Sequence, residues 1–284
     1  MPIGRYQLGV LRSHADSSRN RTGGDHMGIV EEYTRKMASL TGRDIVEPEP
    51  GVLVLPEVQD FRRILAIGDI HGEYERLCSL WAQVDYKPDE DLLIFLGDYI
   101  DRGADPLGCL QLILEIRRLS PYVITLAGNH ELMLREYFQN HDIAEPLVGD
   151  DWTFNGGKTT FLQLQKLQEE EPDEFRRIRT FLYALPYVAF CGPYIFTHAG
   201  LDENRSFVEQ REEMLWKRDA FQTYAGNPFL IVGHTPVQYF GSSYHEPLLF
   251  KNRVLYLDTG SYLPDGHISC IDIKANKVWQ SREG

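Results

Sequence analysis

Gly68-Asp69-Ile70-His71-Gly72 is the stretch around which the rest of this sequence is arranged. It follows a short apolar run typical of a buried strand, and its two glycines let the backbone turn sharply as it leaves the sheet. The turn presents a carboxylate and an imidazole together at a strand end. This ligand pair suits a divalent cation of borderline softness, such as manganese, iron or zinc. Taken alone the pentapeptide is weak evidence, because Gly-Asp turns are common.

The same arrangement, an apolar strand that ends in polar residues, recurs along the chain. The further strands and motifs are 92–96 before Gly97-Asp98-Tyr99-Ile100-Asp101-Arg102-Gly103, 122–127 before Gly128-Asn129-His130-Glu131, 194–197 before His198-Ala199-Gly200, and 229–232 before Gly233-His234-Thr235. Open sheets of the α/β class keep their sites at the carboxyl ends of their strands. Five strand ends that carry Asp, His, Asn and Arg therefore predict one shared site.

Helices are predicted between these strands, which gives the alternation of a layered α/β domain. The predicted helices are 73–84, 106–119 with Asp105 as N-cap, 131–138, and 163–183 with a break near Pro172. Strands are predicted at 254–257, 268–273 and 277–280. The fold class is therefore α/β.

Length, charge and composition exclude several classes of protein. At 284 residues the chain is long enough for one large α/β domain. A net charge of −13 argues against nucleic acid as a partner, because nucleic-acid phosphates require a basic face. No run of about 18 apolar residues occurs, and the first residues lack the apolar core of a signal peptide, so we expect neither membrane insertion nor export.

The four cysteines are scattered, without a CxxC pair, in or beside apolar segments. Such a distribution favours buried thiols over disulfides or a thiolate metal site. A reducing compartment, the cytoplasm, is therefore the expected location.

The five motifs GDIHG, GDYIDRG, GNHE, HAG and GHT resemble those of the phosphoprotein phosphatase branch of the calcineurin-like metallophosphoesterases. The resemblance is strongest to the compact bacterial and bacteriophage lambda type. Three further segments occur in the same order: WTFNGG at 152–157, LWKR at 215–218 and LDTG at 257–260. The resemblance covers about residue 62 to the C-terminus. It implies a layered sandwich of two mixed β-sheets flanked by helices, with a dimetal site at strand carboxyl ends.

The resemblance also implies which residues bind metal. The implied cofactor is two divalent cations, manganese above all, with iron, zinc or nickel as alternatives. The implied ligands are Asp69, His71, Asp98, Asn129, His198 and His234. Asp98 would bridge the two cations, with Asp69 and His71 completing the first site. A bridging hydroxide would attack phosphorus in line.

Catalytic and phosphate-binding roles follow from the same resemblance. His130 would be the general acid for the leaving oxygen, and Asp101 would orient its imidazole. Arg102, Arg218 and Asn129 would bind the substrate phosphate, since a guanidinium fork can bind two phosphate oxygens at once.

We expect three regions along the chain. Residues 1–26 are mostly polar and read as a disordered tail or an extension before Met27. Residues 27–60 are expected to form an N-terminal helix and an arm, because apolar residues between 29 and 40 are spaced for one helical face. Residues 61–284 are expected to form the metallophosphoesterase domain.

The expected reaction is hydrolysis of phosphomonoesters, above all phosphoserine and phosphothreonine in a phosphoprotein or phosphopeptide substrate. One alternative is a symmetric bis(5'-nucleosyl)-tetraphosphate hydrolase, with a dinucleoside polyphosphate as substrate. The protein-phosphatase form is favoured because Asp101 and Glu131 are present, and because the sequence offers no aromatic pair that can be placed to stack two bases. Tyr99, Trp152 and Tyr262 are candidates for that role, but ordinary packing is favoured for them. A non-catalytic phosphate-binding regulatory domain is the weaker alternative.

Overall fold

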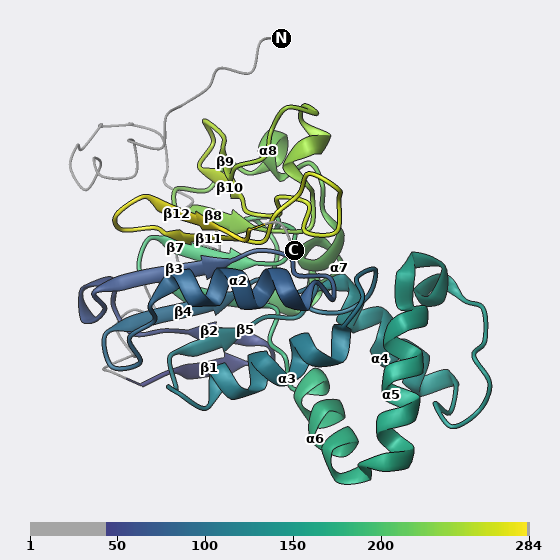
Figure 1. The fold of residues 1–284 in the computed structure, drawn as a ribbon. Coiled ribbons are helices and arrows are strands. Elements are labelled where there is room, and N and C mark those ends of the chain that lie inside the picture. The colour runs from purple at the N-terminus through teal and green to yellow at the C-terminus, as the bar shows by residue number, and fades with distance from the viewer. Residues whose placement is uncertain (1–43, 283–284) are drawn as a thin grey trace, which may run out of the picture.

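The structure is a computed structural model, and it describes residues 44–282 (Figure 1). The predicted tail at 1–26 and the predicted helix within 29–40 lie outside the described residues. Two β-sheets form the centre of the fold, a seven-stranded sheet of order β1-β2-β6-β7-β8-β10-β9 and a five-stranded sheet of order β12-β11-β3-β4-β5.

The strands have the following bounds. The seven-stranded sheet contains β1 (Val46–Glu49), β2 (Val52–Val54), β6 (Val188–Cys191), β7 (Tyr194–Thr197), β8 (Phe229–Val232), β9 (Leu248–Leu249) and β10 (Val254–Tyr256). The five-stranded sheet contains β3 (Arg63–Ile67), β4 (Asp91–Phe95), β5 (Val123–Thr125), β11 (Ser269–Asp272) and β12 (Lys277–Gln280). Both sheets are mixed, with β3, β4 and β5 parallel in one and β7, β8 and β10 parallel in the other. The predicted fold class is confirmed.

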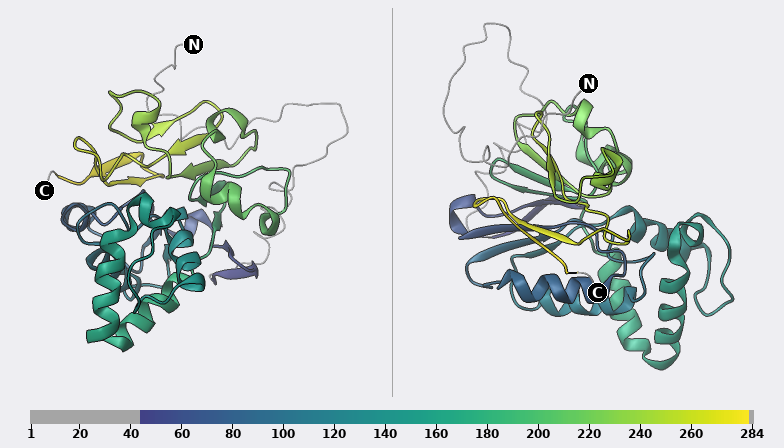
Figure 2. Two further views of the ribbon diagram at one scale, coloured as in Figure 1. Left: turned by 90° about the vertical axis from the view of Figure 1, so that its right-hand side faces the viewer. Right: turned by 45° about the horizontal axis from the view of Figure 1, so that its top comes forward.

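The helices cover the outside of the sheets. They are α2 (Tyr74–Val84), α3 (Pro106–Arg117), α4 (Asn129–Asn140), α5 (Lys158–Glu170), α6 (Pro172–Tyr183), α7 (Arg211–Trp216) and α8 (Ala220–Thr223). Short helical turns are η2 (Val58–Asp60), η3 (Thr153–Gly157), η4 (Phe207–Glu209) and η5 (Val237–Tyr239). Figure 2 shows the two sheets as stacked layers, with α4, α5 and α6 grouped to one side. None of the helices in the described part of the chain is long and apolar enough to span a membrane.

The position of β3 in the fold explains why its sequence is continuously apolar. Successive side chains of a strand point to opposite faces, and both faces of this strand are buried. Ile64 and Ala66 pack between the sheets with Phe196 of β7, whereas Leu65 and Ile67 pack on the helix side. Each fully buried apolar side chain contributes about 1.5–3 kcal/mol. The same burial fixes where the strand ends, and therefore where its polar residues emerge.

Several elements differ from the sequence-based expectation, among them β6, α7 and α8, which were not predicted. β5 covers only Val123–Thr125 of the predicted strand at 122–127, because the amide of Ala127 turns away to donate to the Pro186 carbonyl. Strands β1 and β2 were not predicted, and β2 pairs in parallel with β6, which extends the seven-stranded sheet. All four cysteines are free, as predicted, and all but the half-buried Cys78 are buried.

Candidate metal centre

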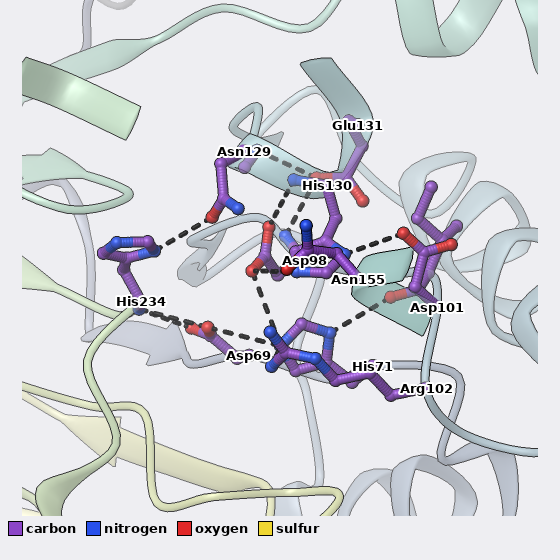
Figure 3. Close-up of polar contacts among 12 residues, drawn as sticks. Asp69, His71, Asp98, Asp101, Arg102, Asn129, His130, Glu131, Asn155 and His234 are labelled. Atoms are coloured by element: carbon purple, nitrogen blue, oxygen red, sulfur yellow. Dashed lines mark hydrogen bonds and ion pairs between the residues drawn. The ribbon is translucent and has the colours of Figure 1, made fainter. Parts of the chain in front are cut away.

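The polar residues that follow β3, β4, β5, β7 and β8 meet at one point, as predicted, and Figure 3 labels those that follow β3, β4, β5 and β8. Asp98 lies at the middle of this group. Its Oδ2 is 3.5 Å from His71 Nε2 and its Oδ1 is 3.4 Å from His198 Nε2. His71 follows β3 in one sheet and His198 follows β7 in the other, so the buried carboxylate lies between residues from both sheets.

The backbone at the centre is held in conformations that residues with side chains rarely adopt. Positive φ angles occur at His71 (50°), Asp98 (53°), Asp101 (70°), Arg102 (67°) and His234 (63°). Such a conformation costs on the order of 1–3 kcal/mol per residue, and it persists only where the surroundings enforce it. The clustering of these angles at one point is typical of a functional site.

Close backbone packing enforces part of this geometry. A Cβ on Gly97 would lie 2.5 Å from the backbone nitrogen of Gly128, and Gly97 itself has a φ of 103°. Only glycine therefore lets the turn after β4 approach the start of α4. This approach allows the amide of His130 to donate to Asp98 Oδ1 at 3.0 Å.

One side of the centre contains Asn129, His198 and His234. Asn129 Oδ1 is 2.9 Å from His198 Nε2 and 2.9 Å from His234 Nδ1. His198 Nδ1 lies 2.9 Å from the Leu96 carbonyl, and donation to that carbonyl leaves Nε2 directed at the centre. Two ring nitrogens, an amide oxygen and the Asp98 carboxylate thus converge. This set of acceptor atoms fits a divalent transition-metal cation.

The other side contains Asp69 and His71. His71 Nδ1 is 3.1 Å from the Ile100 carbonyl, so donation there leaves Nε2 facing the centre. That Nε2 is 3.9 Å from Asp69 Oδ2 and accepts a hydrogen bond from Arg102 Nη1 at 2.8 Å. The Asp69 carboxylate is fixed by the amide of His234, with distances of 3.0 and 3.1 Å to its two oxygens. The Arg102 guanidinium thus contacts His71 Nε2, the atom that the family resemblance assigns as a metal ligand.

The electrostatics of the buried centre also favour a cation. Burial opposes the charged form of Asp98, but three surrounding imidazoles, above all that of His198, hold the pKa of its carboxyl well below the ordinary value. Burial and the neighbouring Asp258 raise the pKa of Asp69 well above the ordinary value. Burial lowers the pKa of His71 well below the ordinary value. Burial also opposes the charged form of His198, but the adjacent Asp98 carboxylate raises its pKa to about 9, so a cation bound at this ring would displace a proton.

Two compact groups of side chains share Asp98. In each group the possible ligand atoms lie within 4.8 Å of one another, and the groups are His71, Asp98 and His130, and Asp98, His198 and His234. A carboxylate common to both groups is what a bridging ligand requires. The first group includes His130, which the resemblance assigned to proton transfer instead.

His130 is oriented by Asp101. The distance from His130 Nδ1 to Asp101 Oδ2 is 2.7 Å. Its Nε2 has no hydrogen-bond partner among the described residues and lies 3.9 Å from Asp98 Oδ2. The imidazole therefore presents a free nitrogen to the centre while its other nitrogen is held by a buried carboxylate.

The two predicted phosphate-binding arginines lie at the rim and are exposed. Arg102 contacts His71 as described, and Arg218 Nη1 donates to the His234 carbonyl at 3.2 Å. The structure thus brings all the predicted site residues together.

Aromatic rings also border the centre, and one of them, Tyr262, was a candidate for base stacking in the sequence. The ring of Tyr262 lies 5.1 Å from that of His71 and 4.3 Å from the Arg102 guanidinium carbon. Trp216, which belongs to the LWKR segment, lies 6.0 Å from the His234 ring and is 42% exposed. Ordinary packing is confirmed for Tyr99, which is buried and donates to the Leu126 carbonyl.

Sequence reasoning missed part of what supports the centre. Glu131 lies in the first turn of α4 and accepts from the Gly128 amide at 2.8 Å. It also accepts from the amides of Asp98 at 2.9 Å and Tyr99 at 2.8 Å, so it joins α4 to the turn after β4. Asp258, buried with one oxygen lacking a partner among the described residues, lies in the LDTG segment that the resemblance had identified.

Known proteins with similar sequences are phosphoesterases, in agreement with the residues found at the centre. The calcineurin-like phosphoesterase family profile matches residues 62–259. Serine/threonine-protein phosphatase 2 of Salmonella typhimurium is 30% identical over 225 residues, which cover 75% of this chain and 94% of that protein. The asymmetrical bis(5'-nucleosyl)-tetraphosphatase PrpE of Halalkalibacterium halodurans is 27% identical over 223 residues, which cover 68% of this chain and 83% of that protein.

Comparison with solved structures identifies the same fold. A structure described as a candidate diadenosine tetraphosphatase superposes with a TM-score of 0.59 at 20% identity, over 83% of this chain and 100% of that one. The family match spans well over half of the sequence and includes the motifs whose residues form the centre. The chain therefore belongs to the calcineurin-like phosphoesterase family of hydrolases.

Proposed function

We propose that this chain is a dimetal-dependent phosphatase that hydrolyses phosphomonoesters, with phosphoserine and phosphothreonine of proteins as its preferred substrates. The observation that carries the proposal is the buried Asp98 carboxylate between His71 and His198, with the free Nε2 of His130 beside it. Shared carboxylate and adjacent imidazole are the two parts that metal-assisted phosphoester hydrolysis requires.

Members of this family use a dimetal site, and the acceptor atoms of the centre fit one. When bound, two divalent cations would neutralise phosphate charge and activate water for in-line attack. We assign the first cation to Asp69, His71 and Asp98, and the second to Asp98, Asn129, His198 and His234. Manganese is the first choice, and iron, zinc and nickel also suit mixed nitrogen and oxygen ligands.

The side chains around the cations have separate tasks. When the bond between phosphorus and the leaving oxygen breaks, that oxygen takes a proton from His130 Nε2. The Asp101 carboxylate accepts from Nδ1 throughout and keeps the ring in place. Arg102 and Arg218 bind oxygens of the phosphate, because their guanidinium groups carry a permanent positive charge.

A second candidate, hydrolysis of dinucleoside tetraphosphates, is favoured by the similarity to PrpE and by the rings of Trp216 and Tyr262. Aromatic rings beside a phosphate site can stack on bases. PrpE is named as an asymmetrical tetraphosphatase, whereas the alternative drawn from the sequence was a symmetric bis(5'-nucleosyl)-tetraphosphate hydrolase.

The test is a side-by-side assay with manganese. We expect a phosphothreonine peptide to be turned over with a higher kcat/KM than diadenosine tetraphosphate. A preference of about tenfold for the dinucleotide, some 1.4 kcal/mol of transition-state discrimination, would reverse the ranking. Absence of turnover of either substrate and of p-nitrophenyl phosphate with manganese, iron, zinc and nickel would refute the enzyme proposal.

A further inference from the structure

Asp101 is held by more groups than His130 alone. Its Oδ2 accepts from Trp152 Nε1 at 2.8 Å in addition to contacting His130. Its Oδ1 accepts from the Thr160 hydroxyl at 2.6 Å, and the same hydroxyl oxygen accepts from the Asp101 amide at 3.1 Å. All four side chains are buried. A buried carboxylate that faces three donors in this way cannot rotate without breaking a hydrogen bond.

The segment 152–160, which contains Trp152 and Thr160, also contacts Arg102, the residue after Asp101 in the GDYIDRG motif. Gly156, with a φ of 104°, accepts from the Arg102 amide at 3.2 Å. A Cβ on Gly156 would lie 2.9 Å from Arg102 Cγ, and a Cβ on Gly157 would lie 2.5 Å from the Trp152 ring. The lack of a side chain at Gly156 therefore leaves room for Arg102. The lack of one at Gly157 leaves room for the Trp152 indole.

These contacts meet two of the residues with left-handed backbone in the GDYIDRG motif, Asp101 and Arg102. Such conformations persist where neighbouring structure enforces them. The amide of each residue donates to the segment 152–160, Asp101 to the Thr160 hydroxyl and Arg102 to the Gly156 carbonyl. The segment thus holds both the backbone and the carboxylate of the pair.

We propose that Trp152 and Thr160 are positioning residues for proton transfer, which fix the Asp101 carboxylate so that His130 presents Nε2 to the leaving oxygen. The proposal rests on the acid role given to His130 above. In that step the P–O bond breaks, its electron pair stays on the leaving oxygen, and the proton moves from Nε2 to that oxygen. The Nδ1 proton remains donated to Asp101. Without the indole and the hydroxyl, the carboxylate and the imidazole lose their fixed orientation.

The test uses two substrates that differ in how much they need an acid. p-Nitrophenyl phosphate has a good leaving group, whereas phenyl phosphate has a poor one and depends on protonation. We expect Trp152→Phe and Thr160→Val, assayed with manganese, to lower kcat/KM for phenyl phosphate by about tenfold or more, because loss of an acid costs roughly 10²–10⁴ in rate. For p-nitrophenyl phosphate we expect a loss below about threefold, with unchanged manganese content by elemental analysis.

Matched variants separate positioning from packing. Thr160→Ser keeps the hydroxyl and is expected to recover most of the rate that Thr160→Val loses. Trp279→Phe changes a half-buried tryptophan on β12 and is the control for a general effect of the substitution. It is expected to leave the ratio of the two kcat/KM values unchanged.

A double-mutant cycle gives the sharpest result. If Trp152 acts through His130, Trp152→Phe causes no further loss on phenyl phosphate in a His130→Asn background. The full loss in that background, or equal losses on both substrates in the single variants, would overturn the inference while leaving the phosphatase proposal intact. Absence of turnover by the unmodified chain with every metal tried would refute the phosphatase proposal instead.

Discussion

Asp98 occupies a position that no other carboxylate among the described residues can fill, because it contacts imidazoles from both sheets. We expect Asp98→Asn to lower manganese occupancy at both proposed sites. An amide carries no charge and offers one oxygen, so it cannot serve two cations as a carboxylate does. Elemental analysis after dialysis against a fixed manganese concentration measures this effect. Asp142→Asn, at an exposed loop position, is the control, and two metals retained per Asp98→Asn chain would contradict the assignment.

His130 can be tested in the same way, because its geometry is compatible with metal binding as well as with proton transfer. We expect His130→Asn to keep its metal content and to lose roughly 10²–10⁴ in turnover of poorly activated esters, with a smaller loss on p-nitrophenyl phosphate. Loss of one metal equivalent in the variant would assign His130 to the ligands. Equal losses on both substrates would remove it from the acid role.

At the scale of single residues, the sequence predicted the site residues that lie within short motifs. It missed the side chains that reach the site only through tertiary contacts. Asp69 and His71 stand two residues apart at a strand end, so their convergence could be inferred. Thr160 lies inside α5, 59 residues from Asp101, and no local pattern distinguishes its hydroxyl from any other helical threonine. Trp152 was a candidate for base stacking with ordinary packing favoured, and its Nε1 partner is likewise set by the fold.

At the scale of elements, the junction between β4 and α4 depends on one buried side chain. Glu131 accepts hydrogen bonds from the amides of Gly128, Asp98 and Tyr99. We expect Glu131→Ala to lower the free energy of unfolding by about 3 kcal/mol or more, because each orphaned buried donor costs about 1–3 kcal/mol. Denaturant unfolding in the presence of a chelator measures this loss without a contribution from metal.

Glu136→Ala is the matched control, since this residue lies on the exposed face of the same helix. A surface change of this kind is expected to stay within about 0.5 kcal/mol. If the two variants lost equal stability, the three amide bonds of Glu131 would contribute nothing beyond helix propensity.

The helices and strands differ in how far the local sequence alone predicts them. Five short apolar runs and the Asp105-Pro106 helix start could be recognised directly, and Asp105 Oδ1 does accept from the Gly108 amide as an N-cap should. β1 escaped prediction because it is only four residues long, contains two glutamates and has little burial. Its neighbour β2 is only three residues long and joins the sheet by pairing with β6, which lies far away in the sequence.

At the scale of the whole molecule, the sequence could not divide the strands between two sheets. Periodicity predicts that a strand is buried on both faces, but it does not say which strand lies against it, so the sandwich was implied by resemblance alone. The division matters for function. Asp69, His71, Asp98 and Asn129 follow strands of the five-stranded sheet, whereas His198 and His234 follow strands of the seven-stranded sheet.

A centre with ligands from both sheets links metal binding to the stability of the whole fold. We expect manganese at about 100 times its dissociation constant to raise the free energy of unfolding by about 2.7 kcal/mol, because the ion binds only the folded arrangement. For a domain of this size the unfolding temperature should rise by about 5–10 °C. Differential scanning calorimetry with and without manganese measures the shift. Asp98→Asn should respond far less, and an equal shift in both proteins would show that manganese acts elsewhere than at this centre.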